Sequence, residues 1–187
     1  MSLIILVLLL YVVQAQVPFL GPCPNVTSME GFQVEKYLGK WYEIERYFAV
    51  FEFAGKCVTA EYSKNSDETV AVHNKQSSSI TGERSAIMGV AKVVGRPDGG
   101  RLSVRFPSLP VQFEAPYWIL DTDYENYSVV WSCLDFGIVN TRNTWILTRA
   151  RTPNPEIMNK AYSILDKMGI DRNLLLKTDQ ENCSDHT

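Results

Sequence analysis

The chain has 187 residues, of which 45% are hydrophobic and 21% charged, an ordinary composition for a globular protein. Its formal net charge of −3 argues against a nucleic-acid partner, because binding to a phosphate backbone requires a basic surface.

The first fifteen residues have the pattern of a secretory signal peptide. Residues 3–13 are an uncharged apolar run, shorter than the roughly 20 residues that a membrane-spanning helix needs. Val13-Gln14-Ala15 supplies the small residues that signal peptidase recognises, although no Lys or Arg precedes the apolar run. We therefore expect cleavage after Ala15, a secreted extracellular protein, and one domain over residues 16–187.

The four cysteines are consistent with a secreted chain. They are Cys23, Cys57, Cys133 and Cys183. An even number predicts two disulfides, with three pairings open, and the lack of a C-x-x-C pair disfavours a zinc or redox site. Three acceptor motifs for N-glycosylation begin at Asn25, Asn126 and Asn182. The first two suit a secretory route, whereas a disulfide at Cys183 would hinder the third.

Between residues 40 and 148 the sequence alternates between short β-type segments and turn-forming residues. The predicted strands are Trp41–Tyr47, Val58–Ser63, Thr69–Lys75, Glu83–Val94, Arg101–Phe106, Tyr117–Thr122, Ser128–Cys133 and Thr144–Thr148. A helix is predicted over Pro155–Met168, with prolines at its start and Gly169 after its end. This order predicts an all-β antiparallel sandwich or barrel with one C-terminal helix packed on it.

Several predicted strands are apolar on both faces, as in Tyr117–Leu120 and Val129–Trp131. An antiparallel sheet with one solvated face would alternate between polar and apolar residues. Both faces must therefore be covered, or one of them lines a dry cavity. The pattern alone leaves open whether an eight-stranded barrel is packed solid or holds one ligand.

Three short motifs give the sequence a specific resemblance. They are G-x-W at Gly39 and Trp41, T-D-Y at Thr122, Asp123 and Tyr124, and a late arginine, Arg149. In this order they resemble the lipocalin family. The resemblance implies an eight-stranded antiparallel up-and-down β-barrel with the C-terminal α-helix on its outside. It also suits a short helical turn over residues 32–38.

The resemblance further implies the roles of several scaffold residues. The disulfides would be Cys23–Cys133 and Cys57–Cys183. Trp41 and Arg149 would stack at the closed end of the barrel in a cation–π contact. These motif residues are expected to support the fold and to take no part in chemistry.

The same resemblance implies a cargo of small hydrophobic molecules, such as arachidonic acid or progesterone. The pocket positions would be Tyr62, Asn74, Gln76, Phe106, Tyr117, Trp118 and Trp145. Asn74 and Gln76 share one face of a strand, so they would orient a ligand if that face is inward. The alternative places them in solvent, with Ala71 and His73 facing in. Two positions after Gln76, where the resemblance allows a basic residue, this chain has Ser78. A neutral or hydrogen-bonded ligand is therefore favoured over one held by charge pairing.

Three unusually apolar segments lie near the expected mouth of the barrel. They are residues 48–53, 109–113 and 136–139. Such clusters usually mark contact with a lipoprotein, a membrane surface or a partner, or they fold over the cavity as a lid. The sequence does not give the oligomeric state.

Other functional classes receive less support. Only two histidines are present, His73 and His186, and neither has an identifiable catalytic partner, so we expect no enzyme activity. No cofactor or metal site is expected. Two further alternatives stay open, a bilin carrier that binds biliverdin, as insect relatives in this family do, and a solidly packed barrel that acts only through protein contacts.

Overall fold

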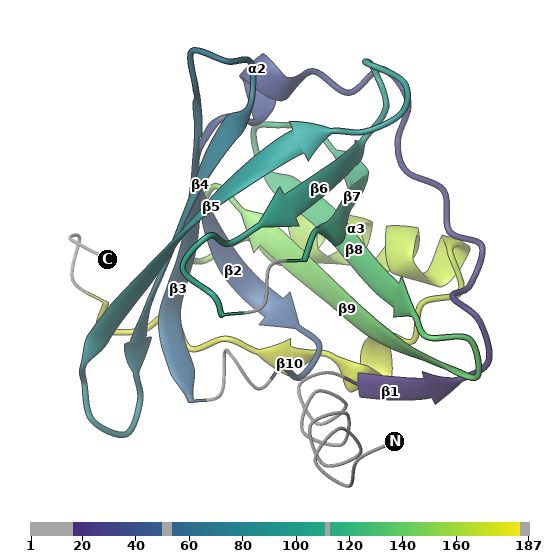
Figure 1. Cartoon of the computed structure of the whole chain (residues 1–187). Coiled ribbons are helices and arrows are strands. Elements are labelled where there is room, and N and C mark those ends of the chain that lie inside the picture. The colour runs from purple at the N-terminus through teal and green to yellow at the C-terminus, as the bar shows by residue number, and fades with distance from the viewer. Residues whose placement is uncertain (1–16, 50–53, 111–112, 184–187) are drawn as a thin grey trace, which may run out of the picture.

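Eight antiparallel strands form a closed barrel in the computed structural model, which describes residues 17–49, 54–110 and 113–183 (Figure 1). The predicted signal peptide lies outside the described residues. The strands are β2 (Gly39–Arg46), β3 (Gly55–Lys64), β4 (Val70–Ser78), β5 (Arg84–Val93), β6 (Arg101–Arg105), β7 (Ala115–Thr122), β8 (Tyr127–Asp135) and β9 (Val139–Thr148). Each strand pairs with the next along the chain, and pairing of β9 with β2 closes the barrel. The predicted up-and-down barrel is confirmed.

Two short strands that the sequence did not predict extend this sheet. β1 (Val17–Leu20) pairs with β9, and β10 (Leu176–Lys177) pairs with β2. At four and two residues they are too short to show an alternating pattern.

Helices cover the outside and one end of the barrel. α2 (Val34–Tyr37) lies just before β2, and α3 (Pro155–Lys167) packs along the outer face of the barrel (Figure 1). The side chain of Asn154 caps α3 by accepting a hydrogen bond from the Ile157 amide. A 3-10 turn, η2 (Arg172–Leu174), leads into β10. No helix among the described residues has the length and apolar character to span a bilayer.

The barrel wall separates two hydrophobic cores, which explains why the strands are apolar on both faces. The inner core lies inside the barrel, and the outer core lies between the wall and α3. In β7, Tyr117 and Ile119 belong to the inner core, while Trp118 and Leu120 belong to the outer one. A strand buried on both sides needs no polar face.

The two disulfides join the chain termini to the barrel, with the predicted pairings Cys23–Cys133 and Cys57–Cys183. The second disulfide holds a C-terminal segment, residues 176–183, against the wall where β2 and β3 diverge. There the Asp179 carbonyl accepts a hydrogen bond from the Cys57 amide at 2.8 Å. The Gln180 side chain donates to backbone carbonyls of both β2 and β3, each at 2.8 Å. The C-terminal segment therefore completes the wall.

Candidate ligand-binding site

The end of the barrel beside α2 is closed by the motif residues. The guanidinium of Arg149 lies 3.7 Å from the centre of the Trp41 ring, so the predicted stacking is confirmed. Arg149 also donates to the carbonyls of Lys40, Leu38 and Tyr124 at 2.7, 2.8 and 3.0 Å. These bonds join the start of β2, the residue before it and the turn between β7 and β8 to the chain just after β9. Gly39 has a φ of +92°, a conformation that disfavours any other residue here.

The T-D-Y motif forms the turn between β7 and β8 at the same closed end. The Thr122 hydroxyl donates to the Tyr127 carbonyl, and Oδ1 of Asp123 accepts hydrogen bonds from the amides of Glu125, Asn126 and Tyr127. Partial burial raises the pKa of Asp123, but these hydrogen bonds outweigh it and hold that pKa below its usual value. The motif therefore supports the fold, as expected from the resemblance.

A chain of tyrosine hydroxyls crosses the interior next to the closed end of the barrel. The hydroxyls of Tyr62 and Tyr117 are 2.7 Å apart, Tyr117 and Tyr37 are 3.5 Å apart, and Tyr37 lies 3.0 Å from the Ser128 hydroxyl. Burial raises the pKa of Tyr37 to about 12 and the pKa values of Tyr62 and Tyr117 well above 10. These groups stay neutral and satisfy one another, so they present an aromatic surface to the space above them.

Aromatic side chains continue up the inner wall. Trp145 and Tyr117 lie with ring centres 6.2 Å apart, and both contact the inner core. Phe106 also faces inward and lies across Gly89 of β5, where an added Cβ would come within 2.8 Å of the ring. Gly89 thus leaves the space that the Phe106 ring occupies.

Asn74 and Gln76 take the inward side of β4. They follow Val70 and Val72 of the inner core at two-residue spacing, which puts Ala71 and His73 on the outer side. The Asn74 side-chain oxygen is buried and has no hydrogen-bond partner among the described residues. A buried acceptor without a partner is uncommon, and it marks a place where a ligand donor would fit.

The prediction that Trp118 lines the pocket is wrong, because Trp118 lies on the outer face of β7. It packs against the outer core, and the guanidinium of Arg101 lies 4.4 Å from its ring centre. Adjacent residues of a strand point to opposite faces, so Tyr117 and Trp118 cannot both line the interior. We leave Trp118 out of the candidate site.

Sequence reasoning missed a set of polar residues nearer the mouth. Thr141 and Asn143 face inward from β9, on the side of Trp145, and are each 3% exposed. Glu43 and Arg46 face inward from β2, with Oε1 of Glu43 3.1 Å from Nε of Arg46. The strand was predicted to begin only at Thr144, whereas β9 begins at Val139. Residues 139–143 are mostly polar and carry no hydrophobic pattern that would have shown a buried strand.

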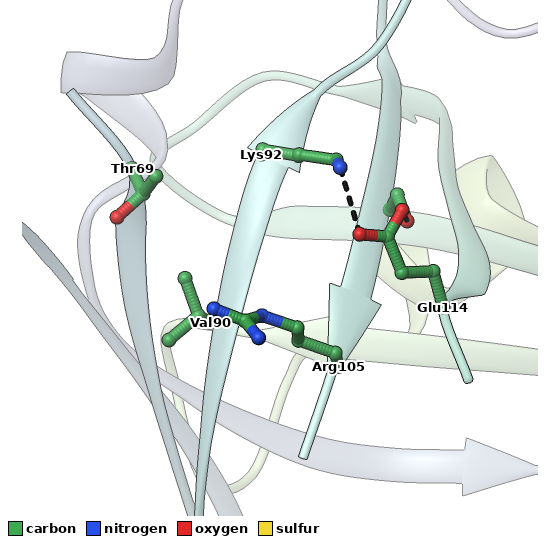
Figure 2. Close-up of a pocket in the computed structure, with 6 residues that line it drawn as sticks. Thr69, Val90, Lys92, Arg105 and Glu114 are labelled. Carbon is green, nitrogen blue, oxygen red and sulfur yellow. Dashed lines mark hydrogen bonds and ion pairs between the residues drawn. The ribbon is translucent and has the colours of Figure 1, made fainter. Parts of the chain in front are cut away.

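A hollow of about 130 Å³ lies on the outer side of the barrel over β5 and β6 (Figure 2). Its lining residues are Thr69, Val90, Lys92, Ser103, Arg105 and Glu114. Lys92 and Ser103 both bond to Glu114, at 2.7 and 2.9 Å, and lower the pKa of that carboxyl. This open, mixed-charge surface is unsuited to an apolar cargo. Among the described residues no group of His, Cys, Asp or Glu is placed to hold a metal ion.

Exposed apolar side chains gather around the open end of the barrel. Leu20, Ile80 and Ile138 are 89%, 75% and 83% exposed. Phe48, Leu109, Phe113 and Phe136 are also exposed and belong to the loops at this end. Residues 50–53 and 111–112 of the predicted apolar segments lie outside the described residues. The described part forms an apolar rim at the mouth.

Comparisons with known proteins agree with this geometry. A family model described as a lipocalin-like domain matches residues 32–180. Mouse apolipoprotein D is 41% identical over 167 residues, covering 89% of this chain and 86% of that protein. The Lazarillo protein of Schistocerca americana is 36% identical over 162 residues, covering 84% and 74%. Insecticyanin from the tobacco hornworm has a similar structure, with a TM-score of 0.77 at 23% identity over 91% of each chain.

Proposed function

Because the chain belongs to the lipocalin family, we propose that it carries a small hydrophobic ligand inside the barrel. The single observation that supports this most directly is the buried, unpartnered oxygen of Asn74 beside an aromatic wall. Binding sites for apolar molecules combine such walls with a few polar groups that fix orientation. Our candidate wall consists of Tyr62, Asn74, Gln76, Phe106, Tyr117 and Trp145.

The candidate ligands are a fatty acid such as arachidonic acid, whose protonated carboxyl could donate to the Asn74 oxygen, and a steroid such as progesterone, whose ketones could accept from the side-chain NH2 of Gln76. The test is titration of the purified protein with these two compounds and with biliverdin, followed by quenching of tryptophan fluorescence. We expect saturation at about one ligand per barrel, with a Kd in the micromolar range or tighter, roughly −8 kcal/mol. If none of the three saturates folded protein, the barrel is packed solid and the carrier function is refuted.

We also propose that the protein is secreted after loss of residues 1–15 and acts without catalysis. Two disulfides suit an oxidising compartment. Asn25 and Asn126 are both exposed, which suits their glycosylation. Expression in a secretory host should give a product beginning at residue 16 whose mass falls on deglycosylation. A product of unchanged mass in both the Asn25→Gln and Asn126→Gln variants would contradict the glycan assignment.

The apolar rim of the mouth is proposed to contact a lipid surface, either a membrane or a lipoprotein. Ile138 is 83% exposed and so is not folded over the cavity as a lid would be. Vesicle flotation with a Phe136→Ser, Ile138→Ser variant tests this, and we expect less protein to float with the vesicles. Met88→Ser is the matched control, because Met88 is exposed on the outer side of β5, away from the mouth. Equal flotation of wild type and the rim variant would refute the contact.

A further inference from the structure

Two buried polar groups on the inner side of β9 lack partners. The Thr141 hydroxyl and the Asn143 side-chain oxygen have no hydrogen bond to any described residue, although each residue is only 3% exposed. They lie two and four residues from the mouth end of β9 at Val139, or about 7 and 13 Å along the strand. Both therefore face the part of the interior that lies between the aromatic side chains of Trp145 and Tyr117 and the open end.

Other hydroxyls of the same strand are satisfied. Thr144 donates to the Val130 carbonyl at 2.8 Å, and Thr148 donates to the Ala150 carbonyl. Carbonyls of β8 and of the segment after β9 thus pair these two hydroxyls, whereas Thr141 and Asn143 have no such partner among the described residues. Buried polar atoms are nearly always paired, and leaving them without a partner destabilises the protein. A ligand that brought only hydrocarbon to this wall would leave both groups unpaired and also shut out water.

The neighbouring charges determine which head group fits. Glu43 and Arg46 form a buried ion pair, and Glu43 also accepts a hydrogen bond from the Thr178 hydroxyl of the C-terminal segment. Arg46 is opposite Trp145 in the strand register and so lies diagonally across from Asn143. Because Glu43 already neutralises Arg46, a carboxylate placed here would meet the like charge of Glu43 without gaining a new cation.

We propose that Thr141 and Asn143 form a head-group subsite that binds a neutral, hydroxyl-bearing lipid, such as a long-chain alcohol, in preference to a fatty acid. A hydroxyl can donate to the Asn143 oxygen and accept from the Thr141 hydroxyl, so one group pairs both atoms. The hydrocarbon chain then points to the floor formed by Trp145, Tyr117 and Leu147 of the inner core. This inference rests on the proposed carrier function and specifies its ligand class.

The test compares three ligands that share one hydrocarbon chain: oleyl alcohol, methyl oleate and oleic acid. For the wild-type protein at neutral pH we expect oleyl alcohol to bind about tenfold more tightly than either of the others, because its hydroxyl forms hydrogen bonds with both Thr141 and Asn143. In the double variant Thr141→Val, Asn143→Leu this preference should disappear, while affinity for methyl oleate stays within about twofold. Equal wild-type affinities, or oleic acid binding most tightly, would overturn the subsite. No binding of any of the three ligands, or of those tested above, would refute the carrier function itself.

A stability measurement on the free protein gives an independent check. Thr141→Val removes a hydroxyl without a partner, so the Tm should stay equal or rise. Thr144→Val is the matched control on the same strand, and its Tm should fall because it loses the bond to the Val130 carbonyl. A lower Tm for Thr141→Val, equal to that of the control, would show that the Thr141 hydroxyl is already satisfied and would contradict the proposal.

Discussion

Replacement of Arg149 by methionine tests whether the closed end of the barrel is held as described. The change keeps the hydrocarbon length but removes three hydrogen bonds of 2.7 to 3.0 Å to carbonyls of Lys40, Leu38 and Tyr124. These carbonyls regain some hydration, so we assign about 1 kcal/mol to each bond. Loss of the contact with Trp41 adds about 1–2 kcal/mol. The expected destabilisation is about 4–5 kcal/mol.

The assay is urea denaturation together with thermal unfolding. At roughly 2–4 °C per kcal/mol for a chain of this size, the Tm should fall by about 8–20 °C. Arg151→Met is the control, because the guanidinium of Arg151 also lies over an aromatic ring, 4.6 Å from the centre of Tyr42, but makes one side-chain hydrogen bond within the described part of the chain, to Gln180. We expect that control to cost about 1 kcal/mol or less. Equal stabilities of the two variants would refute the assigned role of Arg149.

Three further predictions concern other parts of the fold. Asp123→Asn should destabilise the protein at pH 7, as measured by urea titration. The difference in stability from wild type should vanish as the pH falls through the lowered folded-state pKa of Asp123, and a pH-independent difference would contradict this. Replacing both Cys57 and Cys183 by serine should lower the free energy of unfolding by roughly 4–5 kcal/mol, because the disulfide joins residues 126 apart; a loss under 1 kcal/mol would argue against the C-terminal segment completing the wall. Gly89→Ala should force the Phe106 ring to move and weaken ligand binding severalfold in a fluorescence titration, whereas unchanged affinity would remove Phe106 from the site.

Most of the barrel was predictable because its strands differ clearly from their turns in composition. The helix followed from the prolines at its start and Gly169 after its end, and the roles of the motif residues and both disulfide pairings followed from the resemblance. The first half of β9 could not be predicted from the sequence. Its first five residues, Val139–Asn143, are mostly polar yet form a strand whose inward side chains are buried. A polar inner wall cannot be distinguished from a loop by hydrophobic pattern alone.

In β7 the sequence could not show which side chains point into the barrel, because the strand is apolar on both faces. Tyr117 to Leu120 are apolar without interruption, and both sides of the strand are covered. Nothing local then indicates which parity points inward. The three-dimensional packing under α3 decides that Trp118 faces outward, and that decision removes it from the candidate site.

The position of a bound ligand relative to the two tryptophans Trp145 and Trp118 decides whether the ligand lies inside the barrel. Trp145 faces the interior, and Trp118 faces the outer core. Quenching of tryptophan fluorescence by a saturating ligand should therefore fall sharply in Trp145→Phe and persist in Trp118→Phe. Quenching that is lost in Trp118→Phe and kept in Trp145→Phe would place the ligand outside the barrel and contradict the account.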